Sequence, residues 1–594
     1  MFQTFDAPTS PDQGPPRLAL LRQEMADADV DVFLVPRADA HQGEYVAPSD
    51  ERLAWLTGFT GSAGFAAVTA KEAGVFIDGR YTVQVRAQVA RDFTPVDWPA
   101  TQAGPWLKSR LSEGAKVAFD PWLHTAQDIE RLKKDLGTDI VVEPIANLVD
   151  KIWTDRPPAP SEPAEAYPAE FAGETSGEKR QRMAKLLKEA GHKAAFLSLP
   201  DSICWLLNIR GRDIPRNPVM QAFAILHDDA TVTLFVDLAK TEALGPDPSI
   251  TQLKPDALLA ELAQLEGPVR VDKATAPMAV SLALNDAGIE VAWGDDPCIL
   301  AKAQKTDAEI ASTREAHLRD GAAMVEFLCW LDKEALTGTL TEIDVVRALE
   351  GFRRATNALR DISFDTISGA GPNGAIVHYR VTEETNRRVE ANSLLLVDSG
   401  GQYLDGTTDI TRTIAIGTPP QEACEAFTLV LEGMIAISRA RFPRGLSGRD
   451  LDALARAPLW RRGMDYDHGT GHGVGVYMNV HEGPQRLSRV SEVPLKPGMI
   501  LSNEPGYYRE GAFGIRIENL IVVREAQKIG DERDQLDFET LTYVPIDRRL
   551  ILANELHPHD RKALNDYHEL VLEKIGPRVS PEALDWLKDA TRPI

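Results

Sequence analysis

The sequence has few cysteines, and no two of them are close enough along the chain to form a CxxC pair. Only four occur in 594 residues: Cys204, Cys298, Cys329 and Cys424. They stand in apolar surroundings (Leu328 and Trp330 flank Cys329), which is typical of buried free thiols rather than disulfides. We therefore expect a reducing compartment and a cytoplasmic location for the protein.

Basic residues and long apolar runs are also scarce. Lysine and arginine number 65 against 89 acidic residues, which gives a net charge of −24. Nothing in this balance builds the basic face that nucleic-acid binding requires. No apolar run approaches the length of a membrane span, and the first twenty residues, with Asp6, Asp12 and four prolines, do not form a secretory signal. We expect neither a nucleic-acid nor a membrane partner.

The length predicts several domains, because 594 residues exceed what one hydrophobic core accommodates. Residues 1–155 combine a helical leucine pattern over 17–25 with strand patterns over 30–35 and 74–78, which predicts an α/β domain. The proline-rich segment 156–163 sustains neither helix nor sheet and predicts a stiff linker.

A second α/β domain, over residues 156–305, is predicted to duplicate the first. Its opening helix, from residue 176, has Thr175 and Glu178 in capping-box spacing. The segment from Phe196 repeats the segment from Phe33, 163 residues earlier, and Trp205-Leu206 repeats Trp55-Leu56, 150 residues earlier. The two copies therefore differ by an insertion of thirteen residues.

Two further capping boxes introduce the rest of the chain. Thr306 with Glu309 predicts a helix to about residue 336, and Thr341 with Asp344 predicts one to about residue 354. Beyond them we expect strands and turns to about residue 545. The third predicted domain is 306–546, followed by a helical extension over 547–594 with a helix at 557–575.

Four acids and one histidine are candidate ligands of a paired metal site: Asp398, Asp409, His472, Glu504 and Glu518. Mostly hard oxygen donors suit Mn²⁺ or Mg²⁺, and four carboxylates balance the charge of two divalent cations. Each acid taken alone fits a surface charge. Together they border apolar strands, where burying an unpaired charge costs several kcal/mol, so the joint pattern favours a metal pair as the counter-charge.

Strand patterns predict how these acids are presented. Asp398 ends an apolar run and Asp409 opens another, with Gly400-Gly401 between them, which predicts a β-hairpin carrying one carboxylate on each strand. Glu504 and Glu518 are predicted to lie on two further strands. The glycine-rich run around His472 lacks the Lys-Ser/Thr of a phosphate-binding loop, so we attribute its glycines to close backbone approach at the metal site.

These residues and their spacing resemble the pita-bread metallopeptidases, a family that includes aminopeptidase P, prolidase and methionine aminopeptidase. The resemblance rests on the eleven-residue step from Asp398 to Asp409, the segment 468–475 and the motifs around Glu504 and Glu518. It extends to residues 37–45, 58–64 and 78–81, as in the long, three-domain form of aminopeptidase P. It implies an α/β and α+β multidomain fold, with two duplicated creatinase-like N-terminal α/β domains before a pita-bread catalytic domain.

The resemblance implies a role for each ligand. Asp398 would chelate one metal, His472 and Glu504 the other, and Asp409 and Glu518 would bridge both. The two divalent ions would most often be Mn²⁺, with Co²⁺ or Zn²⁺ as alternatives. Glu504 would also accept the proton of the attacking water and pass it to the leaving nitrogen.

Further candidates would bind substrate. His378 and His481 would donate to the substrate carbonyl and the developing oxyanion, although each alone fits a structural histidine. His468 would support the metal ligands without itself binding a metal. Arg516 would either orient Glu518 or contact the substrate. Arg80, with Glu44, resembles a residue that reaches substrate from the N-terminal domain, in the partner subunit of a homodimer.

The implied activity is that of an Xaa-Pro aminopeptidase, which removes the first residue from peptides with proline in second position. A prolidase acting on Xaa-Pro dipeptides is the close alternative, but the duplicated N-terminal half exceeds what prolidases carry. A creatinase-like metal-free enzyme or a histone- or peptide-binding module is the alternative of another class. Those relatives lose the acidic ligands, whereas this chain has all five candidate ligands, four acids and one histidine.

Overall fold

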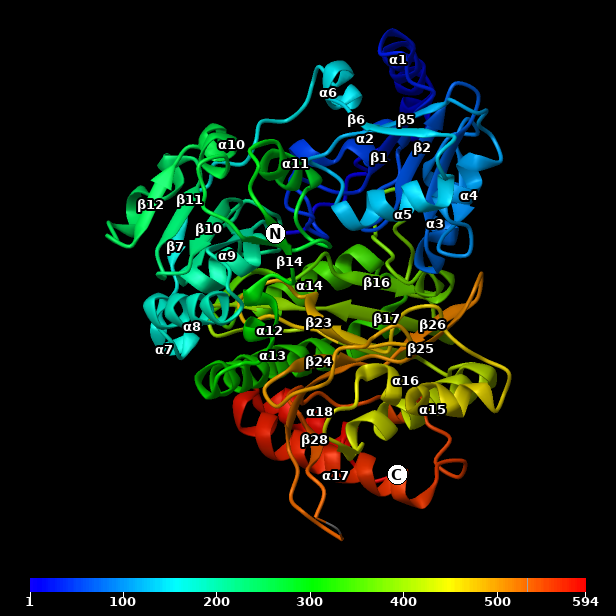
Figure 1. Cartoon of the computed structure of the whole chain (residues 1–594). Coiled ribbons are helices and arrows are strands. Elements are labelled where there is room, and N and C mark those ends of the chain that lie inside the picture. Colours follow the sequence, from blue (N-terminus) through cyan, green and yellow to red (C-terminus); the bar gives the residue numbers. More distant parts are fainter. Residues whose placement is uncertain (531) are drawn as a thin grey trace. The chain divides into compact units, whose positions relative to one another are not determined.

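The structure, a computed structural model, describes residues 1–530 and 532–594 (Figure 1). The chain forms two compact units, unit 1 (Met1–Ala7 and Ala303–Ile594) and unit 2 (Pro8–Lys302). The four cysteines are free and buried, as predicted. Among the described residues, no helix is both long and apolar enough to cross a membrane. The boundaries of the four predicted domains stay a prediction.

Unit 2 contains two six-stranded sheets with the same topology. The first has the order β4-β3-β2-β1-β5-β6 and the second β12-β11-β10-β8-β13-β14. In both, the first strand in the chain has an antiparallel neighbour on one side and a parallel neighbour on the other. The matching order and directions support the predicted duplication. The strands are β1 (Val32–Pro36), β2 (Phe65–Thr69), β3 (Ala73–Ile77), β4 (Thr94–Asp97), β5 (Lys116–Phe119), β6 (Val141–Pro144), β8 (Ala194–Leu197), β10 (Phe223–His227), β11 (Val232–Phe235), β12 (Ile250–Leu253), β13 (Val269–Val271) and β14 (Val291–Trp293).

The helices of unit 2 repeat in the same way. Trp55 lies on α2 and Trp205 on α9, each in the helix that follows the first strand of its sheet. The helix α8 opens with the predicted capping box of Thr175 and Glu178. These elements are α1 (Gly14–Asp27), α2 (Arg52–Thr57), α3 (Thr82–Gln88), α4 (Ala103–Lys108), α5 (Ala126–Leu136), α6 (Leu148–Ile152), α7 (Ala169–Ala172), α8 (Ser176–Glu189), α9 (Pro200–Leu207), α10 (Leu258–Leu262), α11 (Met278–Asp286) and α12 (Pro297–Ala303), with the short strands β7 (Glu165–Ala166) and β9 (Ile209–Arg210).

Unit 1 begins with the two predicted helices α13 (Asp307–Glu334) and α14 (Glu342–Arg354), each with its capping box. The tail forms α17 (Pro558–Ile575) and α18 (Pro581–Ala590). The expectation of only strands and turns between them is wrong. Two helices, α15 (Gln421–Ser438) and α16 (Gly448–Trp460), pack on each other there. A capping box of Ser447 and Asp450 opens α16, and this signal was present in the sequence.

The strands of unit 1 form small sheets that border the acidic residues. One is β16-β17-β20, another is β21-β28-β27-β24-β22-β23, and β25 pairs with β26 in a two-stranded ribbon. In a further three-stranded sheet, β15-β18-β19, the strands β18 and β19 come from the connection between β17 and β20. The strands are β15 (Leu359–Ile362), β16 (Ile367–Ala370), β17 (Ser393–Ser399), β18 (Gly401–Tyr403), β19 (Gly406–Thr407), β20 (Ile410–Ile416), β21 (Phe442–Pro443), β22 (Gly471–Gly473), β23 (Glu482–Leu487), β24 (Ile500–Asn503), β25 (Gly506–Arg509), β26 (Phe513–Arg516), β27 (Asn519–Glu525) and β28 (Gln535–Thr540).

Candidate metal centre

The paired strands β17 and β20 present the first two acids. Leu395 and Val397 pack into a core with α13, so strand alternation directs Asp398 to the opposite face. Asp398 faces Thr411 across the antiparallel pair, and Asp409 directly precedes β20. The predicted antiparallel pairing is confirmed. The predicted turn at Gly400-Gly401 is wrong, because β18 and β19 form a hairpin of their own within the connection.

The two glutamates lie at junctions between strands, whereas the sequence predicted them within strands. Glu504 directly follows β24, and Glu518 separates β26 from β27. Their backbones are nevertheless held. The Glu504 N–H donates to the Thr470 carbonyl at 2.8 Å, and the Glu518 N–H donates to the Thr411 carbonyl at 3.1 Å. The backbone of each glutamate is thus fixed at the point where one strand ends and the chain continues to the next strand.

His472 lies in β22 between Gly471 and Gly473, and the backbone of the neighbouring strands leaves no room for a side chain at either glycine. A Cβ at Gly471 would lie 1.9 Å from the Ser502 carbonyl oxygen, and one at Gly473 would lie 2.1 Å from the Glu482 carbonyl oxygen. The close approach is therefore to adjacent strands, which corrects the expectation of close approach at the metal site. His472 Nδ1 lies 2.9 Å from the Gly473 carbonyl, which can only accept, so Nδ1 carries a proton and Nε2 is the atom available to a metal.

Four of the five predicted ligands converge on one point. Ligand atoms of Asp409, His472 and Glu518 all lie within 4.8 Å of one another. His472 Nε2 also lies 3.4 Å from Glu504 Oε1, the same distance as from Asp409 Oδ2. The fifth, Asp398, contributes to the same electrostatic cluster but is paired with Arg516, whose Nη2 lies 2.5 Å from Asp398 Oδ2.

In this cluster of Asp398, Asp409, His472, Glu504 and Glu518, two buried carboxylate oxygens have no hydrogen-bond donor among the described residues. Asp398 Oδ1 and Glu518 Oε1 are buried and accept no hydrogen bond from the described residues. Burial, together with the charges of Asp409, Glu504 and Asp398, raises the pKa of Glu518 well above its usual range. Unsatisfied buried carboxylate oxygens beside an available imidazole nitrogen fit a site for divalent cations.

Burial and neighbouring charges also shift the pKa values of Asp398, Glu504 and His472. Burial raises the pKa values of Asp398 and Glu504, with Arg516 opposing the shift in both. Burial disfavours the charged form of His472, but its hydrogen bond to Asp409 and the charge of Glu504 raise its pKa to about 9. Without a metal, the cluster therefore favours a proton on the imidazole, which a cation bound at Nε2 would replace.

Arg516 links several parts of the site. Besides Asp398, it donates to the Tyr508 hydroxyl at 2.6 Å and to Thr411 Oγ1 at 3.2 Å. Thr411 Oγ1 in turn donates to Glu518 Oε2 at 2.8 Å. His468 Nε2 lies 2.8 Å from the Tyr508 hydroxyl. The sequence pattern had indicated neither Tyr508 nor Thr411, because a tyrosine or threonine in a strand carries no motif of its own.

The other predicted substrate residues are placed as follows. The His481 ring lies edge-on to the His472 ring, with centroids 4.2 Å apart. His378 follows the short helix η8 (Gly371–Ala375), and Arg516 Nη2 donates to the carbonyl of the preceding Val377 at 3.4 Å. In unit 2, Arg80 is held by Asp78 through bonds of 2.9 and 2.7 Å, beside Glu44, which accepts from Ser62 Oγ.

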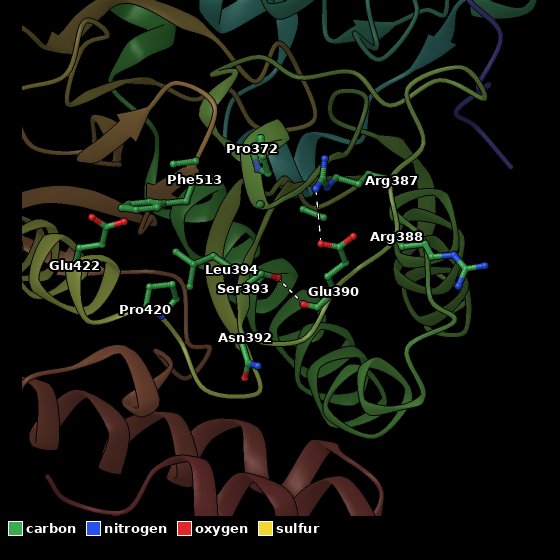
Figure 2. A pocket seen from close by; sticks show the side chains of 13 residues that line it. Pro372, Arg387, Arg388, Glu390, Asn392, Ser393, Leu394, Pro420, Glu422 and Phe513 are labelled. Atoms are coloured by element: carbon green, nitrogen blue, oxygen red, sulfur yellow. Dashed lines mark hydrogen bonds and ion pairs between the residues drawn. The ribbon is translucent and has the colours of Figure 1, made fainter.

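A cavity of about 190 Å³ lies elsewhere in unit 1 (Figure 2). Its lining combines charges of both signs, including Arg387, Arg388, Glu390 and Glu422, with apolar groups such as Phe513. None of the predicted ligands or substrate residues lines it. The assignment of the metal centre therefore rests on the chemistry of the donors and not on the size of a cavity.

Comparison with protein families covers nearly the whole chain. The metallopeptidase family M24 matches residues 311–525, and the C-terminal region of peptidase M24 matches residues 534–594. Two models of the creatinase/prolidase N-terminal domain match residues 17–152 and 155–309. The two matches fall on the two sheets of unit 2, as a duplication requires.

Individual relatives extend over the same length. A probable Xaa-Pro aminopeptidase P from Talaromyces stipitatus is 40% identical and aligns with 97% of this chain and 92% of its own. One from Paracoccidioides brasiliensis is 41% identical over 97% and 99%. Among solved structures, an X-prolyl aminopeptidase from Caenorhabditis elegans, described as a cytosolic enzyme with a di-nuclear active site, has a TM-score of 0.92 at 34% identity, covering 98% of this chain and 99% of its own.

Proposed function

This chain belongs to the Xaa-Pro aminopeptidase P enzymes of metallopeptidase family M24, and from that membership we propose that it removes the N-terminal residue from peptides whose second residue is proline. The observation that carries the proposal is the convergence of Asp409, His472 and Glu518 within 4.8 Å, with Glu504 against His472. Nothing about a binding module would require such a cluster of buried acids.

The cluster would hold two divalent metal ions. Asp398, Asp409, His472, Glu504 and Glu518 are the residues that would hold them, and their oxygen-rich chemistry favours Mn²⁺. When bound, such ions supply Lewis acidity, which lowers the pKa of a bound water from its bulk value to about 7. Support for the number of ions comes from the di-nuclear site of the Caenorhabditis elegans relative. Support for cation binding comes from the two buried oxygens, Asp398 Oδ1 and Glu518 Oε1, that accept no hydrogen bond from any described residue.

The chain's own residues would perform the proton transfers and orient the substrate. Glu504 Oε1 is the candidate base, and Ser502 Oγ donates to it at 3.0 Å, which fixes its orientation. His481 and His378 would donate to the substrate carbonyl as negative charge develops on it. Arg516 holds Asp398 on one side and, through Thr411, Glu518 on the other. His468 would support this side of the site through Tyr508.

We further propose a cytoplasmic homodimer in which Arg80, with Glu44, contributes to substrate binding. The location agrees with four buried free thiols and with the cytosolic relative. Asp78 holds the Arg80 guanidinium through two bonds, which keeps its orientation defined before any substrate binds. Sedimentation of the purified protein tests the dimer, and Arg80→Ala should raise KM if Arg80 meets substrate.

One assay tests the activity. The purified protein is incubated with an Xaa-Pro-Xaa tripeptide, and the free first residue is quantified before chelation, after exhaustive chelation and after Mn²⁺ is restored. We expect the first residue to be released before chelation, no release after chelation, and renewed release once Mn²⁺ is restored. Retention of full turnover by metal-free protein would refute the proposal. Hydrolysis restricted to Xaa-Pro dipeptides would instead identify the prolidase alternative.

A further inference from the structure

Lys305 and Glu482 form an ion pair in the interior of unit 1. Lys305 Nζ contacts Glu482 Oε1, and each side chain is only 1% exposed. A lysine ammonium is almost never buried this fully without a reason, because its desolvation is costly even when a carboxylate faces it. The two residues are 177 positions apart in the sequence, so the pair joins the start of the segment Ala303–Ile594 to the strand β23.

The backbone of Lys305 is fixed on both sides. Its N–H donates to the Gly498 carbonyl at 3.1 Å, and Gln304 bridges to Met499. Gly498 has φ +86°, and a Cβ there would lie 2.7 Å from the Lys305 carbonyl oxygen, so only glycine fits. Thr306, the next residue, caps α13. The ammonium group therefore projects from a rigid point.

Glu482 is the neighbour of His481 and the first residue of β23. It pairs with Gly473, at the register shift that follows His472. Its Oε2 lies against Gly475, where a Cβ would be 3.1 Å away, so the glycine makes room for the carboxylate. His481 directly precedes β23, so Lys305 anchors the residue that follows His481 in the chain, while the His481 ring lies 4.2 Å from the His472 ring.

We propose that Lys305 is a positioning residue: through its ion pair with Glu482 it fixes the His481 imidazole beside the metal ligands. This inference rests on the proposed function. A buried ion pair is weak evidence for stability, since apolar replacements are often as stable, and in some proteins buried charged groups instead specify one conformation or register. A displacement of about 1 Å of a group that must align with the reacting atoms costs about 10²-fold in rate.

The test compares three variants. Lys305→Met removes the ammonium at similar size, and the double variant Lys305→Met/Glu482→Gln also removes the carboxylate that is left uncompensated. Lys302→Met is the matched control, because Lys302 forms a similar buried pair with Asp201, at 2.8 Å, in unit 2. The measurements are kcat and KM on an Xaa-Pro-Xaa peptide, bound metal per chain and thermal midpoint.

For Lys305→Met we expect kcat to fall about 10- to 100-fold with KM within about threefold and metal content unchanged. The double variant should regain thermal stability but not turnover, a split that a merely structural role would not produce. Lys302→Met should lower the thermal midpoint and keep wild-type kcat. Wild-type kcat in Lys305→Met, recovery of kcat together with stability in the double variant, or loss of metal would each overturn the inference.

A readout without turnover separates this inference from the proposed function. The ring C–H signals of His481 are assigned by NMR in the metal-free wild type and followed in the variants. Lys305→Met should shift them and Lys302→Met should not, and unmoved signals would refute the inference. Wild-type protein that cleaves no Xaa-Pro bond would refute the proposed function alone.

Discussion

Arg516 Nη2 lies 2.5 Å from Asp398 Oδ2, so one of the five predicted ligands is already paired with a cation supplied by the protein. The four acids alone would balance two divalent ions. With Arg516 included, the loaded site would carry a net charge of +1. Such a site stabilises negative charge that develops on the substrate, which is a large term in hydrolytic catalysis.

Replacing Arg516 tests this relationship. Arg516→Met should lower turnover by at least about 10²-fold, the scale for losing one oxyanion-stabilising group. In metal-free protein it should also reduce the free energy of unfolding by about 3–5 kcal/mol, because Asp398 then stays buried without its partner. Arg524→Met is the control. It breaks an exposed pair with Asp537 that is worth at most about 1 kcal/mol. Equal stability of the two variants would contradict the assignment.

Substitutions of the two candidate donor histidines, His378 and His481, distinguish an effect on turnover from an effect on metal binding. His378→Ala and His481→Ala should keep wild-type metal content, since neither is a predicted ligand, while turnover falls about 10²-fold or more. Asp409→Ala serves as the opposite control, with loss of both metal and activity expected. Metal analysis alongside kinetics decides the matter. Loss of metal from either histidine variant would mean that the predicted ligand set is wrong.

Much of this fold could be predicted because its signals are local. The capping boxes at Thr306 and Thr341 each begin a helix where the structure has one. The repeat of Trp55-Leu56 at Trp205-Leu206 marks two sheets of identical strand order. Helices α15 and α16 contradict the prediction of strands and turns for the third domain, although a local signal, the capping box of Ser447 and Asp450, indicates α16.

The interior contacts of the site were beyond prediction for a physical reason. Asp398 and Arg516 are 118 residues apart and Lys305 and Glu482 are 177 apart, so their pairing depends on how distant strands assemble. The clustering of Asp409, His472 and Glu518 could be predicted, since carboxylates beside apolar strands need a counter-charge, and their role as ligands stays a prediction. The placement of Glu504 and Glu518 at strand junctions could not, because it depends on where the chain changes from one sheet to another, after Asn503 and after Arg516.

His568 predicts a pH dependence of stability. It is buried on α17, and its Nε2 accepts from the Ile546 N–H at 3.1 Å, so the fold requires the neutral ring. Burial, and then the charges of Arg412 and Arg548, lower its pKa to about 3. In the unfolded chain the pKa is about 6.5. The unfolded state therefore binds the extra proton first, and stability falls as the pH drops from about 6.5 towards 3.

The variant His568→Gln should lose this dependence, because Gln can accept from the same N–H without titrating. Between pH 7 and pH 5 the wild type should lose about 2 kcal/mol through this group. Thermal midpoints of metal-free protein at both pH values measure the difference, and chelation keeps metal release out of the comparison. Parallel falls in both proteins would show that His568 is not the group responsible.

Substrate length distinguishes an aminopeptidase from a prolidase. Proline lacks an N–H and has φ fixed near −65°, and it biases the preceding residue towards an extended conformation. A pocket shaped for that ring would reject other second residues by shape, and binding of the free α-amine at the acidic site would set the cleavage register. We expect Arg-Pro-Pro-type tripeptides to be cleaved efficiently, and Xaa-Ala analogues and N-acetylated peptides to be poor substrates.

Dipeptides are the critical comparison. Residues beyond the proline add binding energy that is remote from the reacting bond and can be used in the transition state. Tripeptides should therefore exceed the matching Xaa-Pro dipeptides in kcat and not only in affinity. Initial rates for both lengths at saturating concentration, with the same Mn²⁺ loading, give the ratio directly. A higher kcat for the dipeptide would assign the site to a prolidase, since extra residues would then hinder rather than assist the reaction.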